Sequence, residues 1–446
     1  MRKLAWTAPT LIATLSVLGC GDDVPIGHGA QNTTGSGGAS GGNAGAGGSA
    51  AAGSGATGSG ASGGSAGAGG SGATGGSAGA GGSGATPGGG GTASGGGASG
   101  AGGSGGSVSC PVAAPTQLTA LASGWPLPRG VAIDADNVYF VNWNNGNGKQ
   151  PSVVKVAKAG GGETVLGNAT LYPAQKSAFA GPETLMLVAD TLYFRAASGS
   201  EVWKMPKTGG APSALYSAGT DPIVLNTPPT APAYSMGVDA QAVYFSRTFW
   251  TSIGSKYTSG IYRVPLTGGA PSLIAEDQND VNQGVGHAGS VLVDGSKVIW
   301  GWWHEAAPGS DGKLRSSGVD GSAQSTLVQT GQVQGIALDQ THAYYAQGPF
   351  LMRVAKTGGA PEAVGQLPGT SPIGYGIALD ANYVYLGYKD LGALPGQCGG
   401  VARLPKTGGA ATVLATGERP AHLAVDATHL YYSDLEAGTV MKLALP

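Results

Sequence analysis

The motif Lys-Thr-Gly-Gly recurs along the chain and could bind phosphate. It occurs in "WKMPKTGGAPSAL" from Trp203, "LMRVAKTGGAPEAV" from Leu351 and "VARLPKTGGAATVL" from Val401, and "IYRVPLTGGAPSL" from Ile261 has leucine in place of lysine. Paired glycines beside a lysine can hold a phosphate group through backbone amides and an ammonium group. A phosphate loop, however, opens a helix, whereas each of these motifs stands between two strand-like runs. We therefore interpret the motif as a repeated tight turn.

Acid–base chemistry has two possible locations. The run "WWHE" from Trp302 is the densest cluster of reactive side chains, but neighbours on an extended chain point in opposite directions, so His304 and Glu305 need not act together. The second, His422 with Glu183, is implied by a family resemblance described below. No GxSxG motif appears. We therefore assign no catalytic residue, and a binding protein is favoured over an enzyme.

Metal, cofactor and nucleic-acid chemistry have little support in the sequence. The histidines outside the N-terminal region show no spacing typical of metal ligands: His287, His304, His342, His422 and His429. Many GxGxxG matches fall before residue 110, but no strand precedes them and no helix follows them. The formal net charge of -2 predicts no electrostatic affinity for nucleic acid. We expect no metal, no cofactor and no nucleic-acid partner.

A sequence repeat must position these side chains. Its copies share an apolar run, usually an aspartate, and usually an aromatic residue five positions later. The aspartate position is occupied in turn by Asp134, Val188, Asp239, Asp294, Asp339, Asp380 and Asp426. These positions lie 41 to 55 residues apart. Repeats of this length without a helical pattern are typical of a β-propeller, in which each repeat is one four-stranded blade.

The four strands of a blade, a to d, can be read directly from each repeat. Strand a is the apolar run, strand b is the Val-Tyr-Phe run, strand c carries a basic residue, and strand d follows the Gly-Gly turn. The last repeat ends at "VMKLALP" and has no strand d. The segment around residues 115–123 matches the missing strand and supplies it. We predict an all-β, seven-bladed β-propeller whose last blade is closed by an N-terminal strand.

The connections between strands distinguish two faces of the propeller. The a–b and c–d turns are short, and we call their side the short-turn face. The b–c and d–a connections lie together on the other side, the long-loop face, because strands in a blade alternate in direction. Long connections are expected at residues 142–152, 167–183, 218–234, 246–260, 276–289, 301–312 and 387–400. Long loops on a rigid scaffold commonly carry function, so we expect the long-loop face to bind.

Two groups of residues are candidates for ligand binding on the long-loop face. The polar residues at the starts of the inner strands are Arg129, Glu183, Tyr234, Gln334, Tyr375 and His422. They either line the mouth of the central channel or cap strands and bind ordered water. The aromatic group and its neighbour are Trp143, Trp250, Trp302, Trp303 and His304. Their rings either contact sugars and peptides or pack inward beneath the loops. Both alternatives stay open at the level of sequence.

The N-terminal region predicts export and anchoring. Residues 1–19 combine a basic start with a short apolar stretch, as in a secretory signal, and the Gly19-Cys20 junction resembles the lipobox of bacterial lipoproteins. The resemblance implies lipidation of Cys20, and ordinary cleavage nearby is the alternative. Residues 20–109 form a Gly/Ser/Ala-rich tether that we expect to be disordered. Residues 110–446 form the propeller. A disulfide between Cys110 and Cys398 stays an open alternative.

The repeats resemble bacterial extracytoplasmic propellers of the NHL, YWTD and streptogramin-lyase-like groups. The resemblance rests on segments such as "VDAQAVYFS" and "VDATHLYYSD". Lactonase-type members would hold a divalent cation with several channel carboxylates, but only Glu183 is acidic here. Streptogramin-lyase-like members would use a histidine with acidic partners, which implies His422 and Glu183.

The resemblance and the residues together lead to one functional expectation and two alternatives. We expect a monomeric envelope lipoprotein that binds a protein, peptide or glycan through its long-loop face. It would touch the membrane through its lipid anchor only, at the outer membrane or cell surface of a Gram-negative bacterium. The alternatives are a lyase or hydrolase at the channel mouth and a purely structural envelope component.

Overall fold

The computed structural model describes residues 117–143, 149–168, 184–196, 201–217, 236–251, 256–280, 286–304, 312–333, 335–369, 371–391 and 399–446. All gaps after residue 117 fall in b–c or d–a connections. Within these ranges no helix is long and apolar enough to cross a membrane. The signal peptide, the tether, Cys20, Cys110 and Cys398 lie outside the described residues, so lipidation, the linker and the disulfide stay predictions.

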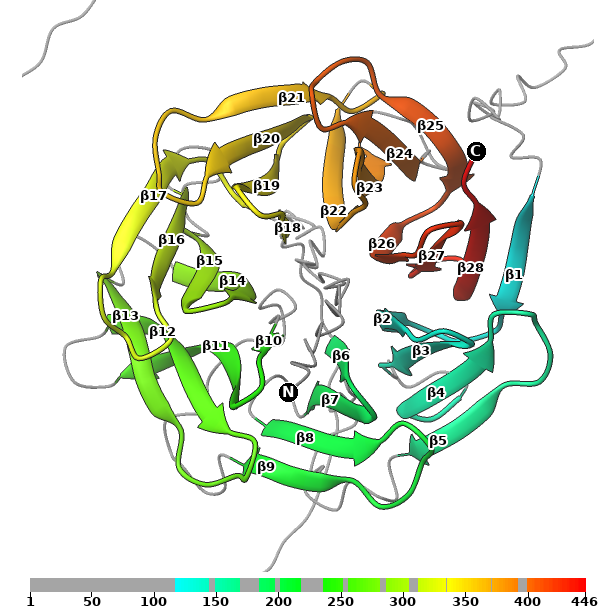
Figure 1. Ribbon diagram of the computed structural model, residues 1–446, viewed down its shortest axis with the longest axis horizontal. Helices are drawn as coiled ribbons and strands as arrows, with labels where there is room; N and C mark the ends of the chain where they lie inside the picture. Colours follow the sequence, from blue (N-terminus) through cyan, green and yellow to red (C-terminus); the bar gives the residue numbers. More distant parts are fainter. Residues whose placement is uncertain are drawn as a thin grey trace, which may run out of the picture. The chain divides into compact units, whose positions relative to one another are not determined.

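Seven four-stranded antiparallel sheets form a closed ring (Figure 1). Blade 1 contains β2 (Pro128–Ile133), β3 (Asn137–Asn142), β4 (Ser152–Ala157) and β5 (Thr164–Asn168). Blade 2 contains β6 (Thr184–Val188), β7 (Thr191–Ala196), β8 (Glu201–Pro206) and β9 (Ser213–Ser217). Blade 3 contains β10 (Met236–Val238), β11 (Ala242–Thr251), β12 (Lys256–Pro265) and β13 (Ser272–Asp280). Blade 4 contains β14 (Gly286–Asp294), β15 (Lys297–His304), β16 (Gly312–Gly318) and β17 (Ser325–Thr330).

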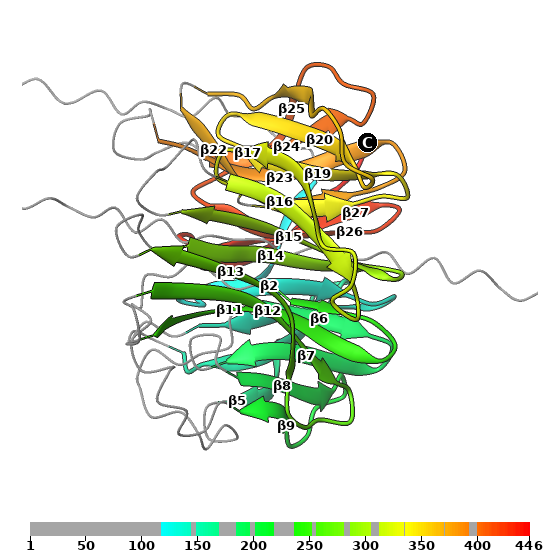
Figure 2. The same cartoon turned by 90° about the vertical axis from the view of Figure 1, so that its left-hand side faces the viewer.

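The remaining blades complete the ring and confirm the predicted fold. Blade 5 contains β18 (Ile336–Leu338), β19 (His342–Gln347), β20 (Phe350–Ala355) and β21 (Glu362–Gln366). Blade 6 contains β22 (Pro372–Leu379), β23 (Tyr383–Asp390), β24 (Gly399–Pro405) and β25 (Thr412–Gly417). Blade 7 contains β26 (Pro420–Val425), β27 (His429–Asp434), β28 (Thr439–Ala444) and, as its outer strand, β1 (Leu118–Ala122). Viewed from the side, the strands of each blade run between the two faces of the ring (Figure 2).

The inner strands are apolar throughout because neighbouring blades cover both of their faces. Every residue of β26 is buried, for example. The inner strands also come very close to one another. A Cβ atom on Gly376 would collide with the carbonyl oxygen of Ala421, and one on Gly335 would collide with that of Tyr375. Glycine at these positions therefore allows the blades to pack around a narrow centre.

The predicted closure of the last blade is confirmed. Strand β1 pairs antiparallel with β28, with Leu118 opposite Leu443 and Thr119 opposite Lys442. Beyond β1, the Trp125 amide donates to the Gly438 carbonyl at 3.1 Å. The two ends of the domain are thus hydrogen-bonded within one sheet. Blade 7 therefore has four strands like the other blades.

Several expected long loops are partly strand. Strands β11 and β12 extend through most of residues 246–260, with Phe249 opposite Thr258 and Trp250 opposite Tyr257. Strand β15 continues to His304 and β23 to Asp390. The physical reason is the aromatic and β-branched content of these runs, which favours strand pairing. The b–c connections of blades 3 and 4 are therefore shorter than the sequence suggested.

The aspartate of each repeat fixes the a–b turn on the short-turn face. In blade 5 the Asp339 Oδ1 accepts the amides of Thr341 and His342, both at 2.8 Å, and its Oδ2 accepts the Tyr344 hydroxyl at 3.0 Å. The same bonds recur around Asp134, Asp380 and Asp426. This arrangement explains why an aromatic residue with a hydroxyl group follows the aspartate at a spacing of five.

The lysine two residues before the paired glycines reaches the aspartate of the preceding blade, both in Lys-Thr-Gly-Gly and in the Lys158-Ala-Gly-Gly variant of blade 1. Four seams between blades carry this ion pair: Lys158–Asp426 at 2.7 Å, Lys207–Asp134 at 3.1 Å, Lys406–Asp339 at 3.4 Å, and Lys356–Asp294. The lysine carbonyl is used as well, because Lys442 Nζ donates to the Lys158 carbonyl at 2.9 Å. The motif is thus a hairpin turn, as predicted, and also a latch between blades.

At the other three seams an apolar residue occupies the position of the lysine. Leu266 in blade 3, Val319 in blade 4 and Leu445 in blade 7 donate the same backbone hydrogen bond to the a–b turn of their own blade. At the seam of blades 2 and 3 both partners change, since Val188 stands in the aspartate position and packs against the same apolar cluster as Leu266. This seam is latched by apolar contact instead of an ion pair.

Candidate functional site

Three of the polar residues predicted at the channel mouth come together on consecutive blades. Tyr375 lies on β22, His422 on β26 and Arg129 on β2, and the exposed fractions of these residues are 2%, 1% and 5%. Strand β26 packs between β22 and β2. The structure therefore places these three residues on adjacent inner strands of blades 6, 7 and 1. Glu183, Tyr234 and Gln334 lie outside the described residues.

Arg129 is paired with an aromatic ring at the mouth. Its guanidinium carbon lies 4.6 Å from the centre of the Trp143 ring, a cation–π distance. Trp143 is half-buried and directly follows β3, where its amide donates to the Leu127 carbonyl at 3.0 Å. The backbone thus holds the indole at the rim while the arginine lies beneath it.

A second arginine–aromatic pair lies one blade away and was missed by sequence analysis. The Arg419 guanidinium carbon is 4.9 Å from the centre of the Tyr375 ring. Arg419 is half-buried in the d–a turn before β26, and Asp434 fixes that turn by accepting the amides of Glu418 at 2.9 Å and Arg419 at 3.0 Å. The available signal was an arginine directly before the inner strand in "GERPAH".

Two exposed apolar side chains extend the site across blades 6 and 5. Leu391 is 46% exposed and follows β23, and Phe350 is 42% exposed and begins β20. Leu391 is in a b–c connection and Phe350 stands at the start of a strand c, so both lie on the long-loop face. The Leu391 amide donates to the Ser371 carbonyl at 3.0 Å, which holds the leucine near β22. Sequence analysis missed both because single apolar residues beside turns carry no distinctive pattern.

We call the set of six residues on blades 5, 6, 7 and 1 the mouth arc. Its members are Phe350, Leu391, Tyr375, Arg419, Arg129 and Trp143. It combines two exposed apolar groups with two arginine–aromatic pairs, and His422 is buried on β26, which packs between β22 and β2. Such a surface can contact apolar and anionic or carbonyl groups of a partner together.

The tryptophans of blade 4 do not extend this surface. Trp302 is 2% exposed and Trp303 is 6% exposed. A Cβ atom on Gly289 would collide with the Trp303 ring, so this ring packs across the inner strand of its own blade. Of the two alternatives left open for these rings, inward packing describes both. Trp250 lies on β11 and His304 on β15, but their side chains lie outside the described residues.

No described group of side chains has the composition of a metal centre. Within the described ranges no three His, Cys, Asp or Glu side chains gather closely enough to hold a metal ion. His422 lies on β26 and is 1% exposed, whereas the acidic partner suggested for it, Glu183, lies outside these ranges. The acid–base pair of His422 and Glu183 therefore stays a prediction.

Comparison with known proteins finds likeness only among solved structures. No protein-family model and no curated protein matches the chain. Puromycin hydrolase is 16% identical with a TM-score of 0.49, covering 70% of this chain and 50% of its own. A virginiamycin B lyase from Staphylococcus aureus, solved with quinupristin, is 11% identical with a TM-score of 0.44, covering 74% and 99%.

A further solved structure, a putative TolB from Agrobacterium tumefaciens, is 13% identical with a TM-score of 0.39, covering 64% of this chain and 94% of its own. At such low identities and TM-scores, likeness does not extend to shared function.

Proposed function

We propose that this protein is a lipid-anchored envelope protein whose propeller binds a protein or peptide partner through the mouth arc. In this proposal the N-terminal cysteine holds the protein at the membrane and the Gly/Ser/Ala-rich region spaces the ring from it. The partner presents an apolar segment flanked by acidic or carbonyl groups. The ring itself acts as a rigid support.

The combination of Leu391, Phe350 and the two arginine–aromatic pairs on one face is the observation that supports this function. Arginine, tryptophan and tyrosine are enriched among the residues that dominate protein–protein binding. Here Trp143 and Arg419 are half-buried, while Arg129 and Tyr375 lie buried behind them. A partner would therefore meet side chains that are already held in place, which lowers the entropy lost on binding.

Removal of single arc side chains tests the proposal. A peptide and envelope-protein library is screened with the full chain, and the affinity of each partner found is then measured for Leu391→Ala, Phe350→Ala and Trp143→Ala. We expect each change to weaken binding by about tenfold, because each removes an anchor of roughly 1 to 2 kcal/mol.

The matched control is Leu273→Ala on β13, since Leu273 is 48% exposed and lies on an outer strand away from the arc. Partners whose affinity falls equally with Leu273→Ala, or with none of the three arc variants, would contradict the proposal. A glycan array is probed in parallel. A peptide partner is contradicted if only glycans bind the protein and if the arc variants bind those glycans more weakly.

A further inference from the structure

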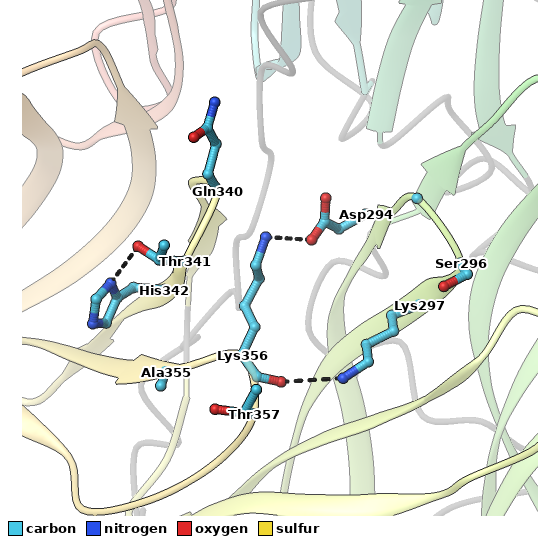
Figure 3. Close-up of a pocket in the computed structure, with 10 residues that line it drawn as sticks. Asp294, Ser296, Lys297, Gln340, Thr341, His342, Ala355, Lys356 and Thr357 are labelled. Atoms are coloured by element: carbon cyan, nitrogen blue, oxygen red, sulfur yellow. Dashed lines mark hydrogen bonds and ion pairs between the residues drawn. The ribbon is translucent and has the colours of Figure 1, made fainter.

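A depression on the short-turn face opens between blades 4 and 5 (Figure 3). Its volume is about 640 Å³. The polar side chains that line it come from the a–b turn of blade 4 and from the a–b and c–d turns of blade 5. They are Asp294, Ser296, Lys297, Gln340, Thr341, His342, Lys356 and Thr357. The depression lies on the face opposite the mouth arc, so it is a separate feature of the ring.

The depression has a cause in the sequence of blade 4. Its a–b turn is a tight hairpin through Gly295, whose φ of 59° favours glycine. Ile299 stands where five other blades have a tyrosine that donates to the turn aspartate. Asp294 therefore uses its carboxylate differently, and its bond to Lys356 is the one it makes among the described residues.

The carboxylate of Asp294 is correspondingly more open than its counterparts. Its side chain is 41% exposed, against 16% for Asp134, 21% for Asp339 and 27% for Asp426. A carboxylate has room for about four hydrogen bonds, so Asp294 keeps acceptor capacity that faces the depression. Figure 3 shows it on one wall, with Lys356 crossing the middle between Asp294 and Thr341.

The opposite wall is ordered by a short hydrogen-bond chain. Thr341 Oγ1 donates to Asp339 Oδ1 at 3.2 Å and lies 2.7 Å from His342 Nδ1. On the other side Lys297 Nζ donates to the Lys356 carbonyl at 3.4 Å, which holds an otherwise exposed ammonium group over the depression. Side chains from both blades are thus held by bonds that leave further donors and acceptors available.

The polar groups of the depression match the chemistry of hydroxyl groups. Asp294 only accepts, Lys297 only donates, and the threonine, serine and glutamine side chains do both. A sugar hydroxyl also donates and accepts, so it can form a hydrogen bond with each of these groups. The Ala355 methyl and the methylene stem of Lys356 supply apolar contact for the C–H face of a ring. Inorganic phosphate fits less well, because its negatively charged oxygens would face the carboxylate of Asp294.

We propose that this depression binds one sugar residue that carries a carboxylate, as in a uronic acid. Asp294 accepts hydrogen bonds from two neighbouring ring hydroxyls, and Lys297 pairs with the sugar carboxylate. The charge of the lining favours an acidic over a neutral sugar, because two lysines face a single exposed aspartate. The occupied site bridges blades 4 and 5 and so also stabilises their seam.

Ligand-observed NMR with the full chain tests this site. The probes are trigalacturonate, a neutral galactose trimer and triglutamate. We expect trigalacturonate to bind with a Kd on the order of 1 mM, as suits a shallow site that holds one ring. The neutral trimer should bind several-fold more weakly. Lys297→Gln should weaken the binding of trigalacturonate by about tenfold, because a charged hydrogen bond is lost, and should have little effect on the binding of the neutral sugar.

Two further variants keep the test decisive. Asp294→Asn should weaken the binding of both sugars, because both donate ring hydroxyls to Asp294. The matched control is Lys149→Gln, since Lys149 lies on the long-loop face and its side chain is 41% exposed. Equal binding of trigalacturonate to wild type and Lys297→Gln would overturn the proposal. Triglutamate binding as tightly as trigalacturonate would overturn the sugar class in favour of an acidic peptide. Either result leaves the partner proposed for the mouth arc untouched.

Discussion

The repeated aspartate acts within its own blade and across the seam to the next. Asp134 accepts two turn amides at 3.0 and 2.7 Å, the Tyr139 hydroxyl at 2.9 Å and the Lys207 ammonium at 3.1 Å. Burial by itself would raise the pKa of Asp134, but the hydrogen bonds from Tyr139 and the turn amides outweigh it and lower the pKa to about 2. The ionised carboxylate is therefore part of the fold at neutral pH.

Comparison of two aspartate variants probes the latch between blades. Asp339 and Asp380 accept the same two turn amides and tyrosine hydroxyl. Asp339 also accepts the exposed Thr341 hydroxyl at 3.2 Å and pairs with Lys406 at 3.4 Å, whereas the seam of Asp380 has Leu445, packed against the cluster of Tyr385, in the lysine position. We expect Asp339→Asn to lower the free energy of unfolding by about 0.5 to 1 kcal/mol more than Asp380→Asn does. Urea unfolding at pH 7 measures the difference, and equal losses would show that the ion pair adds nothing.

The lowered pKa of Asp339 predicts how the stability of the protein depends on pH. Turn amides and Tyr344 outweigh the effect of burial and lower the pKa of Asp339 to about 2, below its ordinary value of 3.8. The stability it contributes is therefore fully present above about pH 4 and is lost as the pH falls through 2. We expect Asp339→Asn to lose less stability than wild type between pH 4 and 2.

At the scale of elements, the seven seams are built from one plan with two kinds of side-chain contact. In each blade the residue that directly follows strand c donates its backbone amide to the a–b turn of the same blade. Its side chain then reaches the preceding blade as an ammonium group at four seams or as an apolar group at three. At the seam of blades 2 and 3 both positions have changed, so Val188 and Leu266 pack against one apolar cluster where other seams pair an aspartate with a lysine.

Exchange of the apolar seam for a charged one tests this plan. We expect Val188→Asp and Leu266→Lys each to lower the free energy of unfolding by about 1 to 2 kcal/mol, because each places a charged group against an apolar partner. The double variant should recover part of this loss, since it recreates the pair found between Asp134 and Lys207 at 3.1 Å. A thermodynamic cycle over the four proteins measures the coupling, and strictly additive losses would contradict the plan.

At the scale of the whole molecule, the ring is closed by two chain ends that are far apart in sequence. Strand β1 pairs with β28, and β28 contributes the buried side chains of Val440 and Leu443, which are 0% and 3% exposed. Each blade packs only on its neighbours, so an open seam would weaken both adjoining blades. Closure of blade 7 therefore supports the entire domain.

Deletion of residues 440–446 tests the closure. This change removes most of β28, its two buried side chains and its bonds to β1, so we expect the loss of at least about 5 kcal/mol and a Tm lower by on the order of 10 °C. Deletion of residues 63–74, one copy of "GGSAGAGGSGAT", is the control and should leave the Tm unchanged. Unfolding as late and as sharp as wild type after the C-terminal deletion would contradict the closure.

The sequence by itself determined the architecture of this protein. Periodic features such as Asp134 with Tyr139, or paired glycines after a basic strand, report local geometry that each blade repeats, so blade number, strand order and closure follow from them. Turn residues and strand runs act over a few positions, and seven copies of the same signal make the assignment strong.

Only the tertiary structure decided which side chains from different blades meet. The pairing of Lys406 with Asp339, the position of Arg419 against Tyr375 and the open carboxylate of Asp294 all depend on contacts across a seam or across the mouth. Such contacts join residues that are dozens of positions apart and differ from seam to seam, so no local pattern encodes them. The physical reason is that turns and strands form from neighbouring residues, whereas binding surfaces form where separately folded blades are brought together.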